Sequence, residues 1–250
     1  MFSGKSNRVY LETERKYRRR MKGRDLVGFE VKVRETDLWI GADRPMVSEA
    51  KDLVFSARQP LEAYVNEHPE FLSALSPVPD DTFAPPIVRD MIHASGSAGV
   101  GPMAAVAGAV AEHVGTGLLA LSSQVIVENG GDVFLSLKRA VTVTVLAGRS
   151  PLSMRVGLRI SARSMPVGVC SSSGSVGHSL SLGRADAACV VARSTALADS
   201  TATALGNRIK KPADLEKAAS WASQIKGVRG GLVVLGKAMA AWGDVELVKL

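Results

Sequence analysis

The sequence predicts an α+β fold in which antiparallel strands are backed by helices. In pairs of segments that flank tight turns, apolar residues alternate at every second position, a pattern typical of β-hairpins. Other segments carry apolar residues three and four positions apart, which is typical of amphipathic helices. The two kinds of segment follow one another without regular strand–helix–strand alternation. A mixed α+β architecture is therefore favoured over a parallel sheet.

The composition is that of an ordinary globular protein. The chain has 250 residues, 46% of them hydrophobic and 22% charged, so it can bury a large core as one domain or two packed lobes. Aromatic residues make up only 5%, which predicts an interior filled by small and β-branched side chains. No apolar run approaches the roughly 18 residues of a membrane span, and residues 1–23 lack the apolar centre of a secretory signal. We expect a cytoplasmic protein with no membrane partner.

The formal net charge of +7 is concentrated at the N-terminus, where nine basic residues occur within the first 24 positions. A solvated terminus is the favoured interpretation, and an arm that binds RNA or a membrane surface is the alternative. Nucleic-acid binding is not expected, because no aromatic residues are interleaved to stack on bases. Cys170 and Cys189 lack the spacing and the histidine partners of a zinc site, so we expect reduced thiols, with Cys189 in the core.

The first half of the chain is expected to contain a hairpin, a long helix, a linker and a second helix. Residues 24–43 alternate as two strands about a turn at 35–37, and helical spacing runs from Val47 to about Ala74. Four prolines break the chain at 76–86, which predicts a linker. The chain is then a single domain, 1–250, with possible sublobes 1–76 and 85–250. Pro102 opens an Ala/Val helix that is expected to end near Gly115.

The second half is expected to be richer in strands. Strands flank a turn at 129–132, where Asn-Gly supplies the positive φ of a primed hairpin turn. The remaining elements expected are strands at 153–161 and 168–183 (with a loop), a buried strand at 185–192, a helix at 196–207 capped by Ser194 or Thr195 and stopped at Gly206-Asn207, a helix at 212–224, and two final strands about Gly230-Gly231. Similar segments in the middle and late parts hint at an internal duplication, without a clear repeat.

The helix at 196–207 carries two polar residues that packing does not explain. Asp199 and Thr203 are four positions apart, so both side chains lie on one helical face. With a carbonyl from elsewhere they form a set of oxygen ligands suited to Mg²⁺. The alternative is that Asp199 complements the helix dipole and Thr203 is tolerated within the helix. The small neighbours are expected to pack against a sheet: Ala196, Ala198, Ala202, Ala204 and Leu205.

Other segments also allow phosphate contacts. The Ser/Gly-rich stretch around Gly174 and Gly177 has the composition of an anion-binding nest, or of an ordinary hairpin loop. His178 in that stretch is a candidate phosphate ligand or acid–base group. Gly99–Ala104 matches G-x-G-x-x-A formally, without the flanking strand and acidic residue of a dinucleotide fold. Serine-hydrolase chemistry is not expected, because the chain has no G-x-S-x-G elbow.

Three of these segments together resemble the ApbE superfamily, whose members use Mg²⁺ to transfer the FMN half of FAD onto a Thr or Ser of a partner protein. VENGGDV (127–133) is similar to the family's Gly-Gly-Asp strand turn, CSSSGS (170–175) to its Thr-Ser-Gly loop, and ALADSTATAL (196–205) to its A-D-x-x-x-T helix. The resemblance covers roughly residues 87–207 and is strongest to a short cytoplasmic branch. It implies a T-fold-like architecture with two similar halves.

The resemblance also implies site residues. Asp199 and Thr203 match the family's metal ligands, and Asp199 and His178 are the implied catalytic residues. The family's A-K-G-Y-A-x-D segment falls near Ala105 to Glu112, where Gly108 and an acidic end persist and the Lys and Tyr are absent. A carbonyl from Ala105 to Ala107 completes the implied metal set. The implied nucleotide-binding residues are Gly130, Gly131, Asp132, Ser171, Ser172, Ser173 and Gly174.

Two functions follow as hypotheses. The first is a Mg²⁺-dependent enzyme that acts on the pyrophosphate of FAD or a related nucleotide, by FMN transfer to an acceptor protein or by hydrolysis. The second is a non-catalytic flavin- or nucleotide-binding protein, which the lost Lys and Tyr favour. Candidates for stacking on a flavin ring are Phe134, Trp221 and Trp242. A homo-oligomer remains open.

Overall fold

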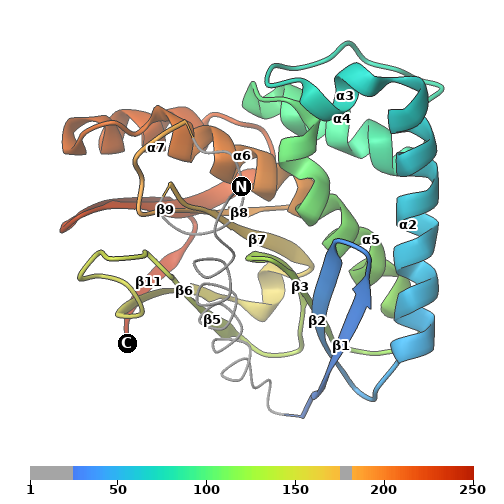
Figure 1. Ribbon diagram of the computed structural model, residues 1–250. Helices are drawn as coiled ribbons and strands as arrows, with labels where there is room; N and C mark the ends of the chain where they lie inside the picture. The colour runs from blue at the N-terminus through green and yellow to red at the C-terminus, as the bar shows by residue number, and fades with distance from the viewer. Residues whose placement is uncertain (1–24, 175–181) are drawn as a thin grey trace, which may run out of the picture.

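The computed structural model describes residues 25–174 and 182–250, which form three layers (Figure 1). The central layer is an eight-stranded antiparallel sheet with the order β1-β2-β3-β4-β7-β8-β9-β10. Its strands are β1 (Val27–Val33), β2 (Thr36–Ala42), β3 (Val125–Asn129), β4 (Asp132–Ser136), β7 (Val167–Ser172), β8 (Ala187–Ala192), β9 (Val228–Leu235) and β10 (Ala238–Gly243). The α+β prediction is confirmed, and the sheet joins two sets of four antiparallel strands.

Helices cover one face of this sheet. They are α2 (Val47–Glu67), α3 (Pro69–Ser73), α4 (Pro86–Ala98), α5 (Val106–Leu118), α6 (Thr195–Arg208) and α7 (Leu215–Ser223), with short 3-10 turns η1 (Pro102–Ala105), η2 (Ala162–Ser164) and η3 (Pro212–Asp214). The main core lies between the helices and the sheet and includes apolar side chains from every strand of the eight-stranded sheet. Many of them are alanine and valine, as the low aromatic content predicts.

The opposite face of the sheet carries a smaller antiparallel sheet of β5 (Val141–Thr144), β6 (Val156–Ile160) and β11 (Glu246–Lys249), in the order β11-β6-β5 (Figure 1). A second core fills the space between the two sheets, where Leu158 and Ile160 pack with Val133 and Leu135. Strands β4, β7, β8 and β9 are therefore covered on both faces. This burial explains why β8 reads as a continuous apolar run, AACVVA.

Several boundaries differ from the sequence prediction. Helix α4 was not predicted, although its buried residues Ile87, Val88, Met91 and Ile92 recur at helical spacing, because prolines before it and Ser/Gly residues at its end are typical of loops. Helix α5 continues to Leu118, past the predicted end at Gly115. Gly230 and Gly231 lie inside β9 and not at a turn, and the chain ends in three strands instead of two. A Cβ at Gly231 would lie 2.4 Å from the Cys189 carbonyl oxygen, so the glycine permits close packing within the sheet.

Among residues 25–174 and 182–250, no single helix is long and apolar enough to cross a membrane. The pair formed by α4 and the segment Pro102–Leu118 meets the length and composition criteria together, with a bend of 102° between its halves.

Candidate functional site

Helices α5 and α6 bind each other's N-termini through carboxylates. Asp199 of α6 accepts a hydrogen bond from the Gly108 amide in the first turn of α5, 2.9 Å from N to Oδ2. In return, Oε2 of Glu112 on α5 accepts hydrogen bonds from the Ser194 hydroxyl and the Thr195 amide, both at 2.8 Å, and from the Ala196 amide at 3.3 Å. Each carboxylate satisfies N–H groups that the helix itself leaves without partners.

Gly108 allows the two helices to approach this closely. A Cβ at Gly108 would lie 2.4 Å from the Thr195 carbonyl oxygen and 2.8 Å from the Asp199 Cβ. A side chain at this position would push α6 away and break the hydrogen bond to Asp199. The small residues predicted to pack on α6 are all buried: Ala196, Ala198, Ala202, Ala204 and Leu205.

A buried acidic cluster lies next to this helix contact. Asp132, at the start of β4, is 8% exposed, and Glu128 near the end of β3 is fully buried. The pKa of Asp132 is raised from 3.8 to about 7, chiefly by burial and also by the Glu128 charge. Hydrogen bonds from the Cys170 thiol and the Ser171 amide lower it in part. The Asp132 Oδ1 atom has no hydrogen-bond partner within the described structure. An orphaned buried carboxylate oxygen is uncommon in folded proteins.

Asp199 belongs to the same cluster. Withdrawal from water raises the pKa of the Asp199 carboxyl well above its ordinary value, and the Asp132 charge raises it further. The amides of Gly108 and Ala107 lower it. The structure thus brings together the Gly-Gly-Asp turn and the A-D-x-x-x-T helix, which are more than sixty residues apart in the chain.

Cys170 completes the cluster and was not predicted to take part. It lies opposite Asp132 in the pairing of β4 with β7, and its Sγ donates to the Thr195 carbonyl at 3.4 Å. Burial raises the pKa of the Cys170 thiol well above its ordinary value, and the charges of Asp132 and Asp199 raise it further. Both cysteines are unpaired, as predicted, and both are buried, which was predicted for Cys189 only. A buried, protonated thiol acts as a weak donor and not as a nucleophile.

The turn at 129–132 has the predicted conformation. Gly130 and Gly131 both have positive φ, at 67° and 115°, as a primed hairpin turn requires. The Gly131 amide donates to Glu128 Oε1 at 3.1 Å, so it is already engaged within the turn. Asn129 donates from Nδ2 to the Ala107 carbonyl at 3.0 Å and joins the turn to the first turn of α5.

The Ser/Gly-rich segment differs from an anion-binding nest in its described part. Ser171 and Ser172 lie in β7 and pair with Cys189 and Ala188 of β8. The Ser173 hydroxyl donates to the Asp186 carbonyl at 2.7 Å, and the Gly174 amide donates to the Ala185 carbonyl at 2.9 Å. These groups extend the β7–β8 ladder. Gly177 and His178 lie outside the described residues, as does the basic segment 1–24.

The predicted metal ligands lie on α6 and at the end of η1. Thr203 lies one turn after Asp199 and is half-buried, and Ala105 is buried at the end of η1, which packs on α6. Within residues 25–174 and 182–250, no three His, Cys, Asp or Glu side chains converge as a metal-binding group. The set available is two carboxylates, a hydroxyl and a carbonyl, which matches Mg²⁺ better than metals that prefer nitrogen or sulfur.

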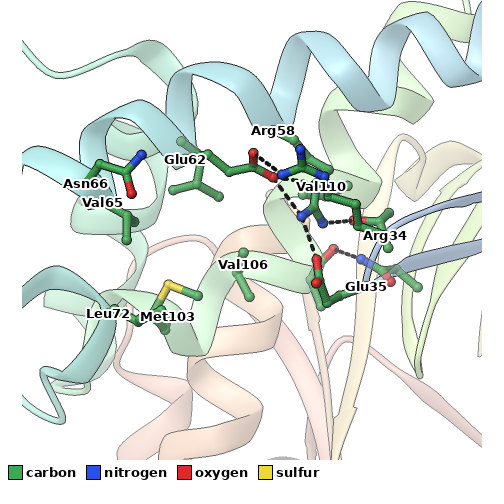
Figure 2. Close-up of a pocket in the computed structure, with 14 residues that line it drawn as sticks. Arg34, Glu35, Arg58, Glu62, Val65, Asn66, Leu72, Met103, Val106 and Val110 are labelled. Atoms are coloured by element: carbon green, nitrogen blue, oxygen red, sulfur yellow. Dashed lines mark hydrogen bonds and ion pairs between the residues drawn. The ribbon is translucent and has the colours of Figure 1, made fainter. Parts of the chain in front are cut away.

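A cavity of about 620 Å³ lies on the other side of the first turn of α5 (Figure 2). It is lined by Arg34, Glu35, Thr36, Arg58, Leu61, Glu62, Val65, Asn66, Leu72, Met103, Val106, Ala107, Val110 and Asn129. Ala107 borders the cavity, and the next residue, Gly108, binds Asp199. This cavity was not predicted from the sequence, because its walls come from five separate segments with no shared motif.

The aromatic candidates for stacking do not line this cavity. Phe134 is buried against Gly115, where a Cβ would lie 2.2 Å from the Phe134 ring. The Trp221 ring lies under the Arg208 guanidinium at 3.4 Å, and the Trp242 ring packs over Gly231. All three rings have structural partners.

The sequence and the fold place the chain in a known protein family. The family model described as AbpE bacteria matches residues 18–227, and the chain belongs to this family, within the ApbE-like superfamily. It is 40% identical over 217 residues to a UPF0280 protein of Methanocella arvoryzae, covering 86% of this chain and 88% of that protein. A UPF0280 protein of Methanosarcina acetivorans is 40% identical over 220 residues, covering 86% of each.

Solved structures show the same fold at low sequence identity. The apo flavinyl transferase ApbE of Pseudomonas stutzeri superposes with a TM-score of 0.57 at 14% identity, covering 86% of this chain and 94% of that one. The flavin transferase ApbE of Vibrio cholerae superposes with a TM-score of 0.54 at 13% identity, covering 88% and 97%. The predicted superfamily and its fold are confirmed.

Proposed function

We propose that this protein is a Mg²⁺-dependent enzyme that acts on the pyrophosphate of FAD or a related nucleotide. The reaction is FMN transfer to a Thr or Ser of an acceptor protein, or hydrolysis of the same bond. Two relatives in fold are named flavin transferases, which supports the flavin nucleotide as substrate. The observation that carries the proposal is the buried Asp132, whose Oδ1 atom has no partner and whose charge raises the pKa of the Asp199 carboxyl.

The residues present fit a magnesium ion. Mg²⁺ takes oxygen ligands, commonly one or two carboxylates together with substrate phosphates and water. Asp132 and Asp199 supply the two carboxylates, and the Thr203 hydroxyl and a carbonyl near Ala105 extend the set. When bound, the ion neutralises charge that develops on the phosphate oxygens during P–O cleavage.

The chain's own groups then bind and orient the nucleotide. Asp132 and Asp199 would hold the ion, whose positive charge would offset the repulsion between the two carboxylates. The hydrogen bond from the Gly108 amide fixes the orientation of the Asp199 carboxylate, so its remaining oxygen is presented in one direction. The backbone of 130–131 and 171–174 flanks the nucleotide, and His178 assists the incoming nucleophile.

A non-catalytic flavin- or nucleotide-binding protein is the second candidate, and a specific observation favours it. Asp199 and the Ala107 carbonyl already have partners, the Gly108 amide and the Asn129 side chain. Both groups therefore have a structural reason to be present without catalysis. In this case the nucleotide binds and its pyrophosphate stays intact.

The test is incubation with FAD and MgCl₂, with and without candidate acceptor proteins, and chromatography of FMN and AMP. We expect AMP release by the wild type and at least a 100-fold loss in Asp199→Asn, which keeps an oxygen for the Gly108 amide and removes the charge. Asp244→Asn, at an exposed position, is the matched control and should react normally. FAD binding without AMP release in all three proteins would reject the enzyme and support the binding protein.

A further inference from the structure

Strand β10 forms one edge of the eight-stranded sheet. Within residues 25–174 and 182–250, its single neighbour in the sheet is β9. The two strands are joined by a two-residue turn of Gly236, with φ of 60°, and Lys237, so that Leu235 lies opposite Ala238. In a hairpin of this kind the closing pair exchanges hydrogen bonds, and every second residue along each strand points its amide and carbonyl away from the other strand.

The outer side of β10 therefore presents main-chain groups that can pair with a further strand. The Asp244 amide donates to the Arg229 carbonyl at 2.8 Å, which fixes the alternation of inward and outward residues along the hairpin. Counted back from this bond, Met239, Ala241 and Gly243 point their N–H and C=O groups outward.

This edge lacks the features that usually protect an exposed strand. Natural edge strands carry charged side chains, prolines or bulges that prevent pairing with another chain. The opposite edge of the sheet, β1, has the exposed charged residues Glu30 and Lys32. Strand β10, AMAAWG, has no charged residue and no proline, and its register with β9 is regular. Its exposed side chains include Met239 and Ala241, both apolar, so the edge is suited to bind a strand.

The charges that flank β10 favour a second copy of this chain as the partner. Lys237 precedes the strand, Asp244 and Glu246 follow it, and all three are exposed. When a strand pairs antiparallel with its own copy, the start of each strand meets the end of the other. Each lysine then lies beside carboxylates of the second copy, whereas a parallel arrangement would bring like charges together.

We propose that β10 pairs antiparallel with β10 of a second copy across a twofold axis, which joins the two eight-stranded sheets into one. With Ala241 opposite Ala241 of the second copy, Met239 lies opposite Gly243, and all three outward-pointing residues of each strand are paired. The small Ala241 side chains allow close approach at the axis. Strands β8 and β9 separate this edge from β4 and β7, so the inference does not depend on the proposed function.

The first test is sedimentation velocity of the full-length protein at about 1–100 μM, a range that covers moderate affinities. We expect a species of twice the 26.3 kDa mass of one chain. A monomer over the whole range overturns the proposal.

A proline substitution tests whether the main chain of β10 forms the interface. Ala241→Pro removes the outward amide at the axis, and the folded chain tolerates it because this amide has no partner within the sheet. We expect dimerisation to weaken at least about tenfold. Lys32→Pro is the matched control, because Lys32 points its amide outward from β1 in the same way, and it should remain a dimer. A folded Ala241→Pro that dimerises like the wild type overturns the proposal.

Charge substitutions provide a second measurement that keeps every amide. Ala241→Lys places two lysines together at the axis and should give a monomer, which keeps the proposal testable if Ala241→Pro does not fold. Lys237→Glu places like charges together at both ends of the paired strands and should weaken dimerisation about fivefold. Asp244→Asn removes one charge and no main-chain group, so it should remain a dimer. Unchanged dimerisation of both lysine-changing variants, Ala241→Lys and Lys237→Glu, would place the interface elsewhere and overturn the proposal.

Discussion

Two clusters of charged side chains flank the first turn of α5 and are built on opposite principles. In the ion-pair network, Glu35, Arg58, Glu62 and Arg34 alternate in sign, and each charge has a partner within 2.7 Å. In the acidic cluster, Asp132, Asp199 and Glu128 have the same sign, and one carboxylate oxygen is left alone. The first arrangement stabilises the fold by itself, whereas the second becomes favourable when a cation or a proton is added.

The largest expected effect is on the ion-pair network. Arg58→Ala removes one arginine from between two carboxylates, so we expect the free energy of unfolding to fall by about 2 kcal/mol. Urea denaturation measures the change. Arg44→Ala is the control, since the Arg44–Glu49 pair is exposed and should be worth at most about 0.5 kcal/mol. Equal effects of the two variants would remove the distinction between this network and an ordinary surface pair.

Glu112 tests whether a carboxylate near the acidic cluster can be purely structural. Its three hydrogen bonds to the start of α6 predict that Glu112→Ala lowers the free energy of unfolding by about 1.5 kcal/mol. Glu216→Ala, at an exposed position in the first turn of α7, is the control and should change stability much less. A stabilised Glu112→Ala variant would show that Glu112 belongs with the repelling carboxylates.

Magnesium should relieve the repulsion in the acidic cluster. At a Mg²⁺ concentration tenfold above Kd, binding to the folded state adds about 1.4 kcal/mol, which corresponds to a Tm rise of about 3 °C for a chain of this size. Thermal unfolding with and without MgCl₂ measures it. The rise should vanish in Asp132→Asn and Asp199→Asn, and its persistence in both variants would place the ion elsewhere.

The smallest effect concerns pH. The folded-state pKa of Asp132 is raised from 3.8 to about 7, so between these values the folded protein holds a proton that the unfolded chain releases. Stability in EDTA should therefore fall as pH rises through this window. Asp132→Asn should flatten that slope and raise the free energy of unfolding at pH 8 by about 1 kcal/mol. The control Asp244→Asn should keep the wild-type slope, and an unchanged slope in Asp132→Asn would assign it to another group.

The sequence predicted the local elements of the candidate site better than its surroundings. The Asn129–Asp132 turn and the Ser194-capped helix depend on residues within a few positions of each other, so short-range rules identify them. The helix ends at Gly206-Asn207 and Gly115 were set too early, because packing continues both helices by one or more residues. The final strands were misplaced, since a glycine pair within a strand looks like a turn without knowledge of the neighbouring strand.

By itself the sequence determined the fold class, the family motifs and the spacing of Asp199 and Thr203, because these depend on backbone periodicity and on residues close together in the chain. Only the tertiary structure decided that Asp199 accepts a hydrogen bond from the Gly108 amide, that Cys170 lies opposite Asp132, and that a cavity lies beside α5. Contacts between distant segments depend on how closely helices and strands approach, here through Gly108. That distance is set by the packing of the whole core and leaves no local pattern in the sequence.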